Sequence, residues 1–523
     1  MEQVIFGGFT DLLHDTTTEY SSLAGGAAWV ATGSFSRQVV STGGVIKNLR
    51  VKLVDSPGAG KHYDFTLMLN GNPTALTLEI ADAATTGSNT ANEIAVTAGD
   101  IVYLECNPDS TPTARYATWT SVFVGTTAKE SLILGGSRAN TLDKTNIRYI
   151  QLMGGNIWVR LDENEVRQVC PTAGKIKNLY VLLSADPGTD PDAYRFTLRI
   201  DGVNQTLTVT ITADNTTGND TANEVVVAAG DVLTIMVEPL NTPSATPYAY
   251  WGMTFVADND GESVVLSGTP LDLHATQTRY NYLQNSYPGG WSATETIRYQ
   301  LGQVCTLKKL YVLLSGAPGA GNKYTFTARI AGASSNVVAE VADTATTGNS
   351  GALTDTVAND EYVNLMVVPT STPTVRDAYW GLVSFIAVIA DVVVTPTTLA
   401  LSITTFIPVV DTTPTIIDSY VEANRDNHIS IKALHPSAVG LVSALGQSFT
   451  GDGNKIGYVQ FYIKKTVGSP VGELTARLYA ISGTFGTSNV PAGAALASSS
   501  PMAIEDIGAG DFELVTFTFD GSF

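Results

Sequence analysis

The sequence is poor in charge and has no long apolar run. Asp, Glu, Lys and Arg make up only 15% of its 523 residues, and the formal net charge is −20. No run of Lys and Arg is longer than two residues, so the positive surface that binds nucleic acid or anionic lipid is missing. No stretch of about 18 apolar residues occurs, which excludes a transmembrane helix. We therefore expect neither a nucleic-acid partner nor insertion into a membrane.

Cysteine is also scarce. The chain has three cysteines, an odd number, so a disulfide framework is not expected to hold the fold. Matching the repeats described below places Cys170 and Cys305 at one position, where the first copy has Val40, and this exchange indicates a small buried hydrophobe. The opening MEQVIFGGFTDLLHDTTTEYSS has no basic region and no apolar region, so no secretory signal is expected.

Catalytic and metal-binding motifs are missing as well. None of the five histidines falls in an HExxH or His/Cys spacing, and none is found to recur across the repeats. No GxSxG, P-loop or dinucleotide-binding motif occurs, and no CxxC pair. We expect no catalytic residue and no zinc site. The histidines are His14, His62, His274, His428 and His435.

What the sequence does have is one phrase written three times. It reads QVVSTGGVIKNLRVKL from Gln38, QVCPTAGKIKNLYVLL from Gln168 and QVCTLKKLYVLL from Gln303, the last four residues shorter. Each phrase leads into a Pro-Gly turn and then into segments that alternate apolar and polar residues between Gly, Asn and Asp clusters. Period two with such turns predicts antiparallel strands, and the abundance of Thr, Val and Gly favours β structure.

The repeats define the domain organisation. Three units, 1–127, 128–260 and 261–390, each have the size of a two-sheet sandwich, and the jelly roll is the expected wiring. A Thr- and Pro-rich segment, 391–417, is predicted to be an extended linker. The remainder, 418–523, is predicted to be a fourth β-sandwich. It stops just after a strand, which suggests a truncated sequence or a closing strand from another chain.

The tryptophans follow the repeats, two to a copy. A tryptophan that stands at the same place three times is interpreted as a core residue. The six are Trp29, Trp119, Trp158, Trp251, Trp291 and Trp380.

Two groups of acidic residues are candidates for calcium, because each gathers oxygen ligands within a few positions. They are Asp186, Asp190 and Asp192 in ADPGTDPDAY, and Asp258, Asp260 and Glu262 in ADNDGE. Asp also forms turns on solvated edges, and the other copies lack the first triplet. We favour the turn interpretation and expect no cofactor, with calcium as the alternative.

Another acid recurs in all three copies. Asp100, Asp231 and Asp360 precede a strand in AGDI, AGDV and ANDE, where a carboxylate caps backbone amides. The two carboxylates of a glycosidase should be singular, whereas the prominent acids here are triplicated or lie in turns. This favours a protein that is not an enzyme.

The repeated block IKNLYVLL…PG…FTLRI…TTG…VAAGD…TP…W resembles the tandem β-sandwich modules of tailed-phage structural proteins, which include head fibres, decoration proteins and tail fibres. The last module, with GQSFTGDGNKIGYVQFYIKK and GSPVGELTARLYAISGTFG, is similar to carbohydrate-binding-like sandwiches of phage and bacterial surface proteins. The resemblance covers nearly the whole chain and brings no catalytic signature with it.

The resemblance implies a virion structural protein at the particle surface that contributes to host attachment. It implies a homotrimer, capsid or tail proteins as partners, and a host-surface glycan as a ligand. We expect the three repeats to form a row that gives length, with one end on the particle and the last module as a tip. The alternative is a secreted adhesin or filament subunit on the bacterial cell surface, with carbohydrate-binding modules.

Overall fold

The computed structural model shows an all-β protein. It describes residues 2–26, 28–138, 140–155, 159–284 and 290–386, followed by shorter segments: 399–404, 415–418, 428–431, 444–449, 458–463, 473–482, 490–503, 506–507 and 513–519. Strands make up 60% of the structure and no described helix reaches seven residues, which confirms the predicted fold class. Among these residues no helix is long and apolar enough to cross a membrane. The chain divides into two compact units, Met1–Val388 and Ile389–Phe523.

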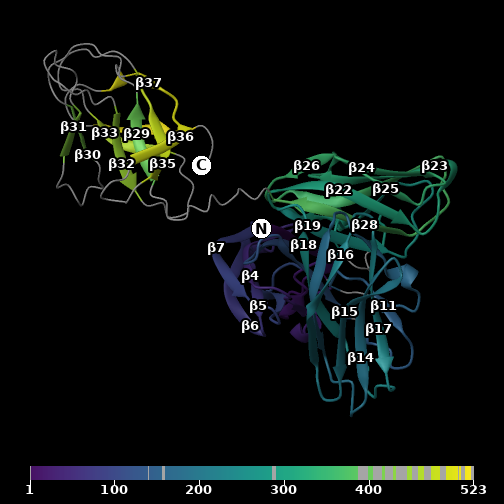
Figure 1. Ribbon diagram of the computed structural model, residues 1–523. Coiled ribbons are helices and arrows are strands. Elements are labelled where there is room, and N and C mark those ends of the chain that lie inside the picture. The colour runs from purple at the N-terminus through teal and green to yellow at the C-terminus, as the bar shows by residue number, and fades with distance from the viewer. Residues whose placement is uncertain are drawn as a thin grey trace. The chain divides into compact units, whose positions relative to one another are not determined.

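The first repeat, drawn in purple and dark blue in Figure 1, is a jelly roll by its strand order. One sheet has the order β1-β9-β4-β7 and the other β2-β8-β5-β6, with β3 also paired to β8. When β2 and β3 are taken as one interrupted strand, the two orders are those of a jelly roll built from two Greek keys. The strands are β1 (Glu2–Leu12), β2 (Glu19–Ser21), β3 (Gln38–Val39), β4 (Gly44–Leu53), β5 (Gly58–Leu69), β6 (Asn72–Asp82), β7 (Thr86–Val96), β8 (Ile101–Asp109) and β9 (Tyr116–Gly125).

The second and third repeats have the same wiring. The second contains β10 (Glu130–Gly136), β11 (Arg148–Ile150), β12 (Gln168–Val169), β13 (Gly174–Leu183), β14 (Ala193–Ile200), β15 (Val203–Thr212), β16 (Thr217–Val227), β17 (Val232–Leu240) and β18 (Ala249–Ala257). The third contains β19 (Glu262–Thr269), β20 (Arg279–Asn281), β21 (Gln300–Leu301), β22 (Cys305–Leu314), β23 (Gly319–Ile330), β24 (Ala333–Asp343), β25 (Thr347–Asn349), β26 (Thr354–Val357), β27 (Tyr362–Thr370) and β28 (Ala378–Phe385). Short 3-10 turns, η1 (Gly33–Phe35), η2 (Glu163–Val166) and η3 (Thr296–Arg298), precede β3, β12 and β21.

The alternating sequence patterns are strands with one buried face. In β15, VNQTLTVTIT, Leu207, Val209 and Ile211 are buried, and the threonines between them are exposed. The hairpin between β5 and β6 turns through Asn70 and Gly71, whose φ angles are 52° and 84°. Positive φ at both central residues gives the turn whose twist matches that of the strands, and it favours Asn-Gly.

One strand of each repeat is buried on both faces. In β1, Ile5 lies in the core of its own repeat, whereas Val4 and Phe6 lie in the core of the third repeat. In the same way β10 gives Leu132 and Leu134 to the core of the first repeat. The third of these strands, β19, gives Val264 and Leu266 to the core of the second. Each core is therefore completed by the first strand of another repeat.

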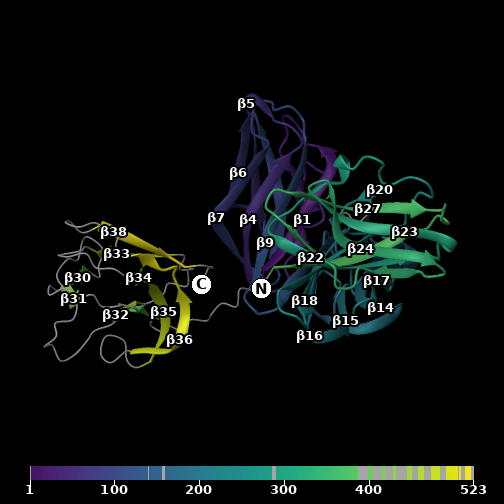
Figure 2. The same cartoon turned by 90° about the horizontal axis from the view of Figure 1, so that it is seen from above.

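These exchanges run in a closed circle. The short strand β3 of the first repeat packs on β10 and β18 of the second, β12 of the second on β19 and β28 of the third, and β21 of the third on β1 and β9 of the first. The strands β1, β10 and β19 also contact one another, so an approximate threefold axis runs between them. We call the three contacts seam 1–2, seam 2–3 and seam 3–1. Figure 2 shows the first repeat in purple and the third in green extending in different directions from where they meet.

The expectation that the repeats form a row is wrong for the Met1–Val388 unit. In a row, β1 and the open end of the third repeat would each expose an apolar face, and closure of the circle buries both. The threefold arrangement that the resemblance implies between chains exists here between repeats of one chain. A homotrimer of whole chains stays a prediction.

A buried glutamine explains why the repeated phrase begins where it does. Gln38 accepts a hydrogen bond from the amide of Ala24 (2.8 Å) and donates to its carbonyl oxygen (3.1 Å). Gln168 makes the same pair of bonds with Met153, 3.0 and 2.9 Å. In the third repeat the partner is Gln284, at 2.9 and 2.7 Å, and the glutamine is Gln300. Because all three glutamines are fully buried, these bonds fasten the loop before each η turn.

Two sequence matches were therefore out of register in the third repeat. Gln303 is not the counterpart of Gln168, since Gln300 takes that place. Cys305 is the first residue of β22, as Gly174 is of β13, and the position of Cys170 belongs to Gly302. Matching QVC to QVC followed residue identity, whereas the hydrogen bonds need a loop only one residue shorter. Cys106, Cys170 and Cys305 are each free and buried, and burial raises the pKa of Cys305 to about 12.

The Ile389–Phe523 unit also consists of sheets. Their orders are β32-β29-β35-β36, β31-β30-β33-β38 and β34-β37. The strands are β29 (Leu399–Thr404), β30 (Thr415–Asp418), β31 (His428–Ile431), β32 (Ala444–Phe449), β33 (Tyr458–Ile463), β34 (Glu473–Leu474), β35 (Ala476–Ser482), β36 (Val490–Ser498), β37 (Met502–Ala503) and β38 (Glu513–Thr518). The predicted linker, 391–417, includes β29 and most of β30. Because β29 pairs with both β32 and β35, its residues belong to a sheet, and the linker prediction is corrected there.

The assignment of the third glutamine is testable by two alanine substitutions. Gln300→Ala leaves a buried amide and a buried carbonyl of Gln284 unpaired, so we expect a loss of about 2–3 kcal/mol in the free energy of unfolding. Gln303→Ala removes a bond to the carbonyl oxygen of Asn48 (2.9 Å) and should cost about 1 kcal/mol. Urea unfolding of the whole chain measures both, and the reverse order of losses would contradict the assignment.

Candidate functional site

The two most deeply buried charged side chains among the described residues, Glu130 and Glu262, lie at seams between repeats. At seam 2–3 the carboxylate of Glu262, 2% exposed, lies 3.0 Å from Lys308 Nζ and 2.8 Å from Lys309 Nζ. Thr172 of the second repeat donates a hydrogen bond of 2.5 Å to the same carboxylate. Burial by itself raises the pKa of Glu262, but the hydrogen bonds from Lys309, Thr172 and Lys308 outweigh it and lower the pKa. The group is held as a carboxylate that joins two repeats.

Seam 1–2 repeats this arrangement. Glu130 is buried and pairs with Lys177 at 2.7 Å, and Thr42 of the first repeat donates to its carboxylate. Gln3 adds a two-way bond to Leu132, accepting from its amide (2.7 Å) and donating to its carbonyl oxygen (2.8 Å).

Glycine lets the backbones approach closely at two seams. A Cβ on Gly252 would lie 1.8 Å from the carbonyl oxygen of Val39, and one on Gly381 would lie 1.9 Å from that of Val169. The backbone of the neighbouring repeat covers these positions so closely that no side chain fits, and glycine is therefore required there. The first repeat has Thr120 at the corresponding place in β9, and Thr120 faces Gln303 of the third repeat at 3.4 Å.

Among the described residues, seam 3–1 has an ion pair that crosses from one repeat to the other, whereas the Glu–Lys pairs at the other two seams each lie within one repeat. Arg50 Nη1 lies 2.8 Å from Asp360 Oδ2, and Lys52 donates to the carbonyl oxygen of Asp360 at 3.1 Å. The ammonium group of Lys52 also lies over the ring of Tyr362, 4.1 Å from its centroid. At seam 1–2 the corresponding surface is apolar, with Tyr180 and Leu182 packed in the cluster that includes Ile101 and Val39.

The recurring acid of the sequence analysis is assigned differently here. The amides of Val40, Cys170 and Gly302 donate to the carbonyl oxygens of Asp100, Asp231 and Glu361, so Glu361 is the third member. The side chains of all three cap a backbone amide three residues earlier, at 2.7, 2.7 and 2.8 Å. The capping role is thus present, but Asp360 stands one residue earlier, at a position where the first two repeats have glycine. It is therefore free to pair with Arg50.

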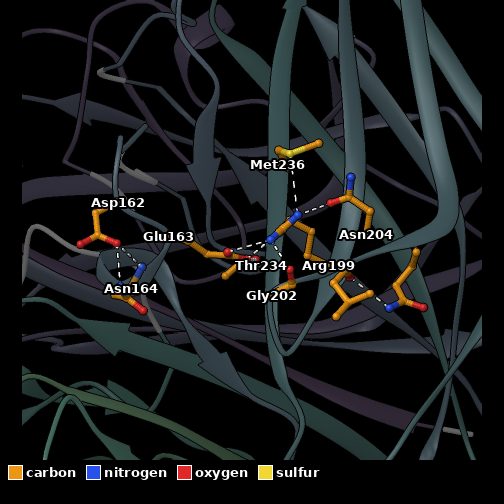
Figure 3. A network of polar contacts seen from close by, with 10 residues as sticks. Asp162, Glu163, Asn164, Arg199, Gly202, Asn204, Thr234 and Met236 are labelled. Carbon is orange, nitrogen blue, oxygen red and sulfur yellow. Dashed lines mark hydrogen bonds and ion pairs between the residues drawn. The ribbon is translucent and has the colours of Figure 1, made fainter.

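A second polar network lies within the second repeat (Figure 3). Arg199 binds Glu163 through two hydrogen bonds, 2.8 and 3.0 Å, and Thr234 donates to the same carboxylate at 2.6 Å. Burial acts to raise the pKa of Glu163, but the bonds from Arg199 and Thr234 lower it overall. The network includes Asn204 and the carbonyl oxygen of Gly202, which closes the hairpin from β14 to β15 against η2.

The same network changes as a unit between repeats. In the third repeat Glu295 pairs with Arg329 at 2.8 Å. In the first repeat Gly33 and Met68 take these places, and a Cβ on Gly33 would lie 3.0 Å from the ring of Tyr103. An aromatic ring thus replaces an ion pair under the 3-10 turn. This pattern is typical of packing inside a repeat.

One cluster could hold a metal ion, and the sequence analysis did not predict it. Among the described residues, His62, Asp64 and Glu79 form the group whose ligand atoms lie within 4.8 Å of one another. The Nε2 atom of His62 is 3.6 Å from Asp64, 3.8 Å from Glu79 and 3.4 Å from Asp109. The corresponding sheet faces carry the ion pairs Arg195–Glu238 and Lys323–Glu340. The first repeat therefore places three carboxylates around one imidazole, on an open surface.

Each repeat has an equivalent loop between its first two strands. In the second repeat this loop lines a shallow, open depression of about 510 Å³. Asp143, which lines it, accepts from the amides of Thr145 (2.8 Å) and Asn146 (3.0 Å) and also binds Arg148. Burial raises the pKa of this carboxyl, but these hydrogen bonds dominate and hold it well below its usual range. His14 and His274 fill the same role with Nδ1, each accepting from two amides. The statement that no histidine recurs is therefore wrong for these two.

The predicted core tryptophans divide into two sets. Trp119, Trp251 and Trp380 are fully buried, and their indole N–H groups donate to the carbonyl oxygens of Leu23, Leu152 and Leu283 at 2.9, 2.8 and 3.1 Å. Trp29 and Trp291 pack on Trp119 and Trp380, with ring centroids 5.1 and 5.4 Å apart. Trp158 lies outside the described residues.

The acids considered for calcium are not gathered into a site. Glu262 is occupied at seam 2–3. Asp260 accepts from the amide of Gly261 (2.9 Å), and Asp192 accepts from the amide of Ser244 (3.0 Å). None of Asp186, Asp190, Asp192, Asp258 and Asp260 belongs to the metal-ligand group found among the described residues. Their described bonds are those of turns.

The buried carboxylate at seam 2–3 predicts a pH dependence. Because the folded pKa of Glu262 is lowered, its contribution to stability is complete above the unfolded value of 4.5 and is lost as the pH falls through the folded value. Glu262→Gln should cost about 2–3 kcal/mol at pH 7 and flatten the loss of stability below about pH 4.5.

The matched control is Glu340→Gln, which breaks an exposed pair with Lys323 and should cost no more than about 1 kcal/mol. Denaturant unfolding between pH 3 and pH 7 measures both variants. Equal losses in the two, or an unchanged acid slope in Glu262→Gln, would contradict the account.

No protein-family model matches the chain, and no curated protein matches it. The seams, the polar network and the metal-ligand group therefore stand on this chain's own residues.

Proposed function

We propose that the protein is a non-enzymatic structural component of a virion surface, of the capsid-decoration, head-fibre or tail-fibre kind. The observation that carries the proposal is the closed circle of three jelly rolls, in which β1, β10 and β19 each complete the core of another repeat. Such a body cannot lose one repeat without exposing the core of another. Rigidity of this kind suits a protein that must survive outside a cell.

The charged groups support a structural role. Glu262, Glu163 and Asp143 are each fixed by several hydrogen bonds and held as carboxylates. A general acid needs a raised pKa, whereas the pKa of each of these three carboxyls is lowered. The three carboxylates serve the fold.

The sequence resemblance supplies the location and the partners. On that basis capsid or tail proteins would hold the Met1–Val388 unit, and the Ile389–Phe523 unit would contact the host surface, with a glycan as the ligand class. The acidic balance, −20 overall, agrees with a protein that avoids nucleic acid during assembly.

Immunogold electron microscopy tests the location. Antibody raised against residues 1–388 is applied to virus particles and to cells from the source, and the expected result is label on the capsid or tail of the particles. Label on cell-surface fibres with none on particles would overturn the proposal and support the bacterial adhesin.

A further inference from the structure

Seam 3–1 differs from the other two seams because no direct peptide link spans it. The first and second repeats are joined by the short turn 126–129, and the second and third by the short turn 258–261. The first and third repeats meet only through side chains and backbone contacts. The two surfaces of seam 3–1 are therefore complementary whether they belong to one chain or to two.

The arrangement of the seams is head to tail. Each repeat offers one surface to the repeat before it and a different surface to the repeat after it, which is the heterologous type of contact. Three such contacts close a circle and satisfy all three repeats. A repeat that leaves its own circle can therefore bind the same two surfaces in another chain whose corresponding repeat has also left.

Seam 3–1 has charged residues where seam 1–2 has apolar ones, as expected of a contact that must select its partner. The surface that carries Arg50 and Lys52 in the first repeat carries Tyr180 and Leu182 in the second. Apolar surfaces are enough where a short turn presents the partner, whereas charges reject wrong partners. The Arg50–Asp360 pair marks the one seam whose partner is not delivered by the chain.

We infer that the third repeat is exchanged between two copies of this chain: the third repeat of one chain closes the circle of a second chain, and the reverse, giving a domain-swapped dimer in which seam 3–1 and seam 2–3 both form between chains. The turn 258–261 is the hinge. It lies between Ala257 and Glu262 and contains Gly261, at φ +83°. Short hinge loops favour this kind of exchange.

Concentration decides between the two forms. Within one chain the third repeat faces the first at an effective concentration set by the short connection, on the order of millimolar. Closure within the chain therefore dominates in dilute solution. Exchange requires folding at high chain concentration, such as that at a site of assembly.

The test uses charge reversal in the whole chain. Arg50→Asp places two acids at seam 3–1, and Asp360→Arg places two bases there, so neither variant closes its own circle well. When the two variants are refolded together, each third repeat finds an opposite charge on the other chain. The double variant Arg50→Asp/Asp360→Arg restores the pair within one chain and is the matched control. Light scattering coupled to size-exclusion chromatography gives the masses.

The expected result is a species of twice the chain mass, formed only in the mixture, while the control stays at the mass of one chain. If the single variants do not fold alone, recovery of β-sheet circular dichroism only on mixing supports the same conclusion. The inference is overturned if the mixture has no species of double mass and no recovered fold while the control is folded.

Discussion

The structure depends on the burial of three strands on both faces. β1, β10 and β19 carry runs of apolar residues in which neighbours point to opposite sides, and each side enters a different core. A strand at the edge of a sheet that exposed such a run would invite aggregation. Closure into a circle covers the outer face of β1 as well as those of β10 and β19, which explains why the first and third repeats must meet.

The polar chemistry of the seams follows from that burial. Once the strands are covered, the groups beside them lose water and need partners. Glu130 is met by one lysine of its own repeat and Glu262 by two, and each also binds a threonine of the repeat before. The cost of burying these charges is offset only because every bond is made. The seams therefore contribute specificity of pairing, and the shared apolar cores contribute most of the stability.

The fold class, the repeats and their strand patterns could be predicted from the sequence because a strand with one buried face alternates apolar and polar residues. The register of the third repeat could not, since Gln303 and Asp360 match their supposed counterparts in identity while Gln300 and Glu361 match them in hydrogen bonding. The loop between the buried glutamine and the next long strand is one residue shorter in the third repeat, and matching identical residues does not show this. The closure had one signal: SLIL and SVVL are apolar at consecutive positions, which is typical of strands covered on both faces.

The equivalence of His14 and His274 in their repeats was missed for a related reason. In the second repeat Asp143 fills the same capping role. The three residues therefore differ in type although each accepts hydrogen bonds from the same backbone amides of its loop. The metal-ligand group of His62, Asp64 and Glu79 arises from strands β5 and β6, whose register places Glu79 opposite Asp64. His62 and Asp64 are two residues apart, but the third ligand comes from the strand pairing, which a motif search does not detect.

Contact between the first and third repeats is the central claim, and zero-length cross-linking measures it directly. A carbodiimide joins an amine to a carboxylate only when the two groups touch, so the monomer isolated from dilute solution is treated and its peptides are identified by mass spectrometry. The exposed pairs Lys175–Glu224 and Lys323–Glu340 serve as internal standards. Because the carboxylate of Asp360 faces the Arg50 side chain, the experiment uses the Arg50→Lys variant, which places an amine there. The account predicts a peptide that joins position 50 to Asp360, and its absence when both standards are joined would contradict the closed circle.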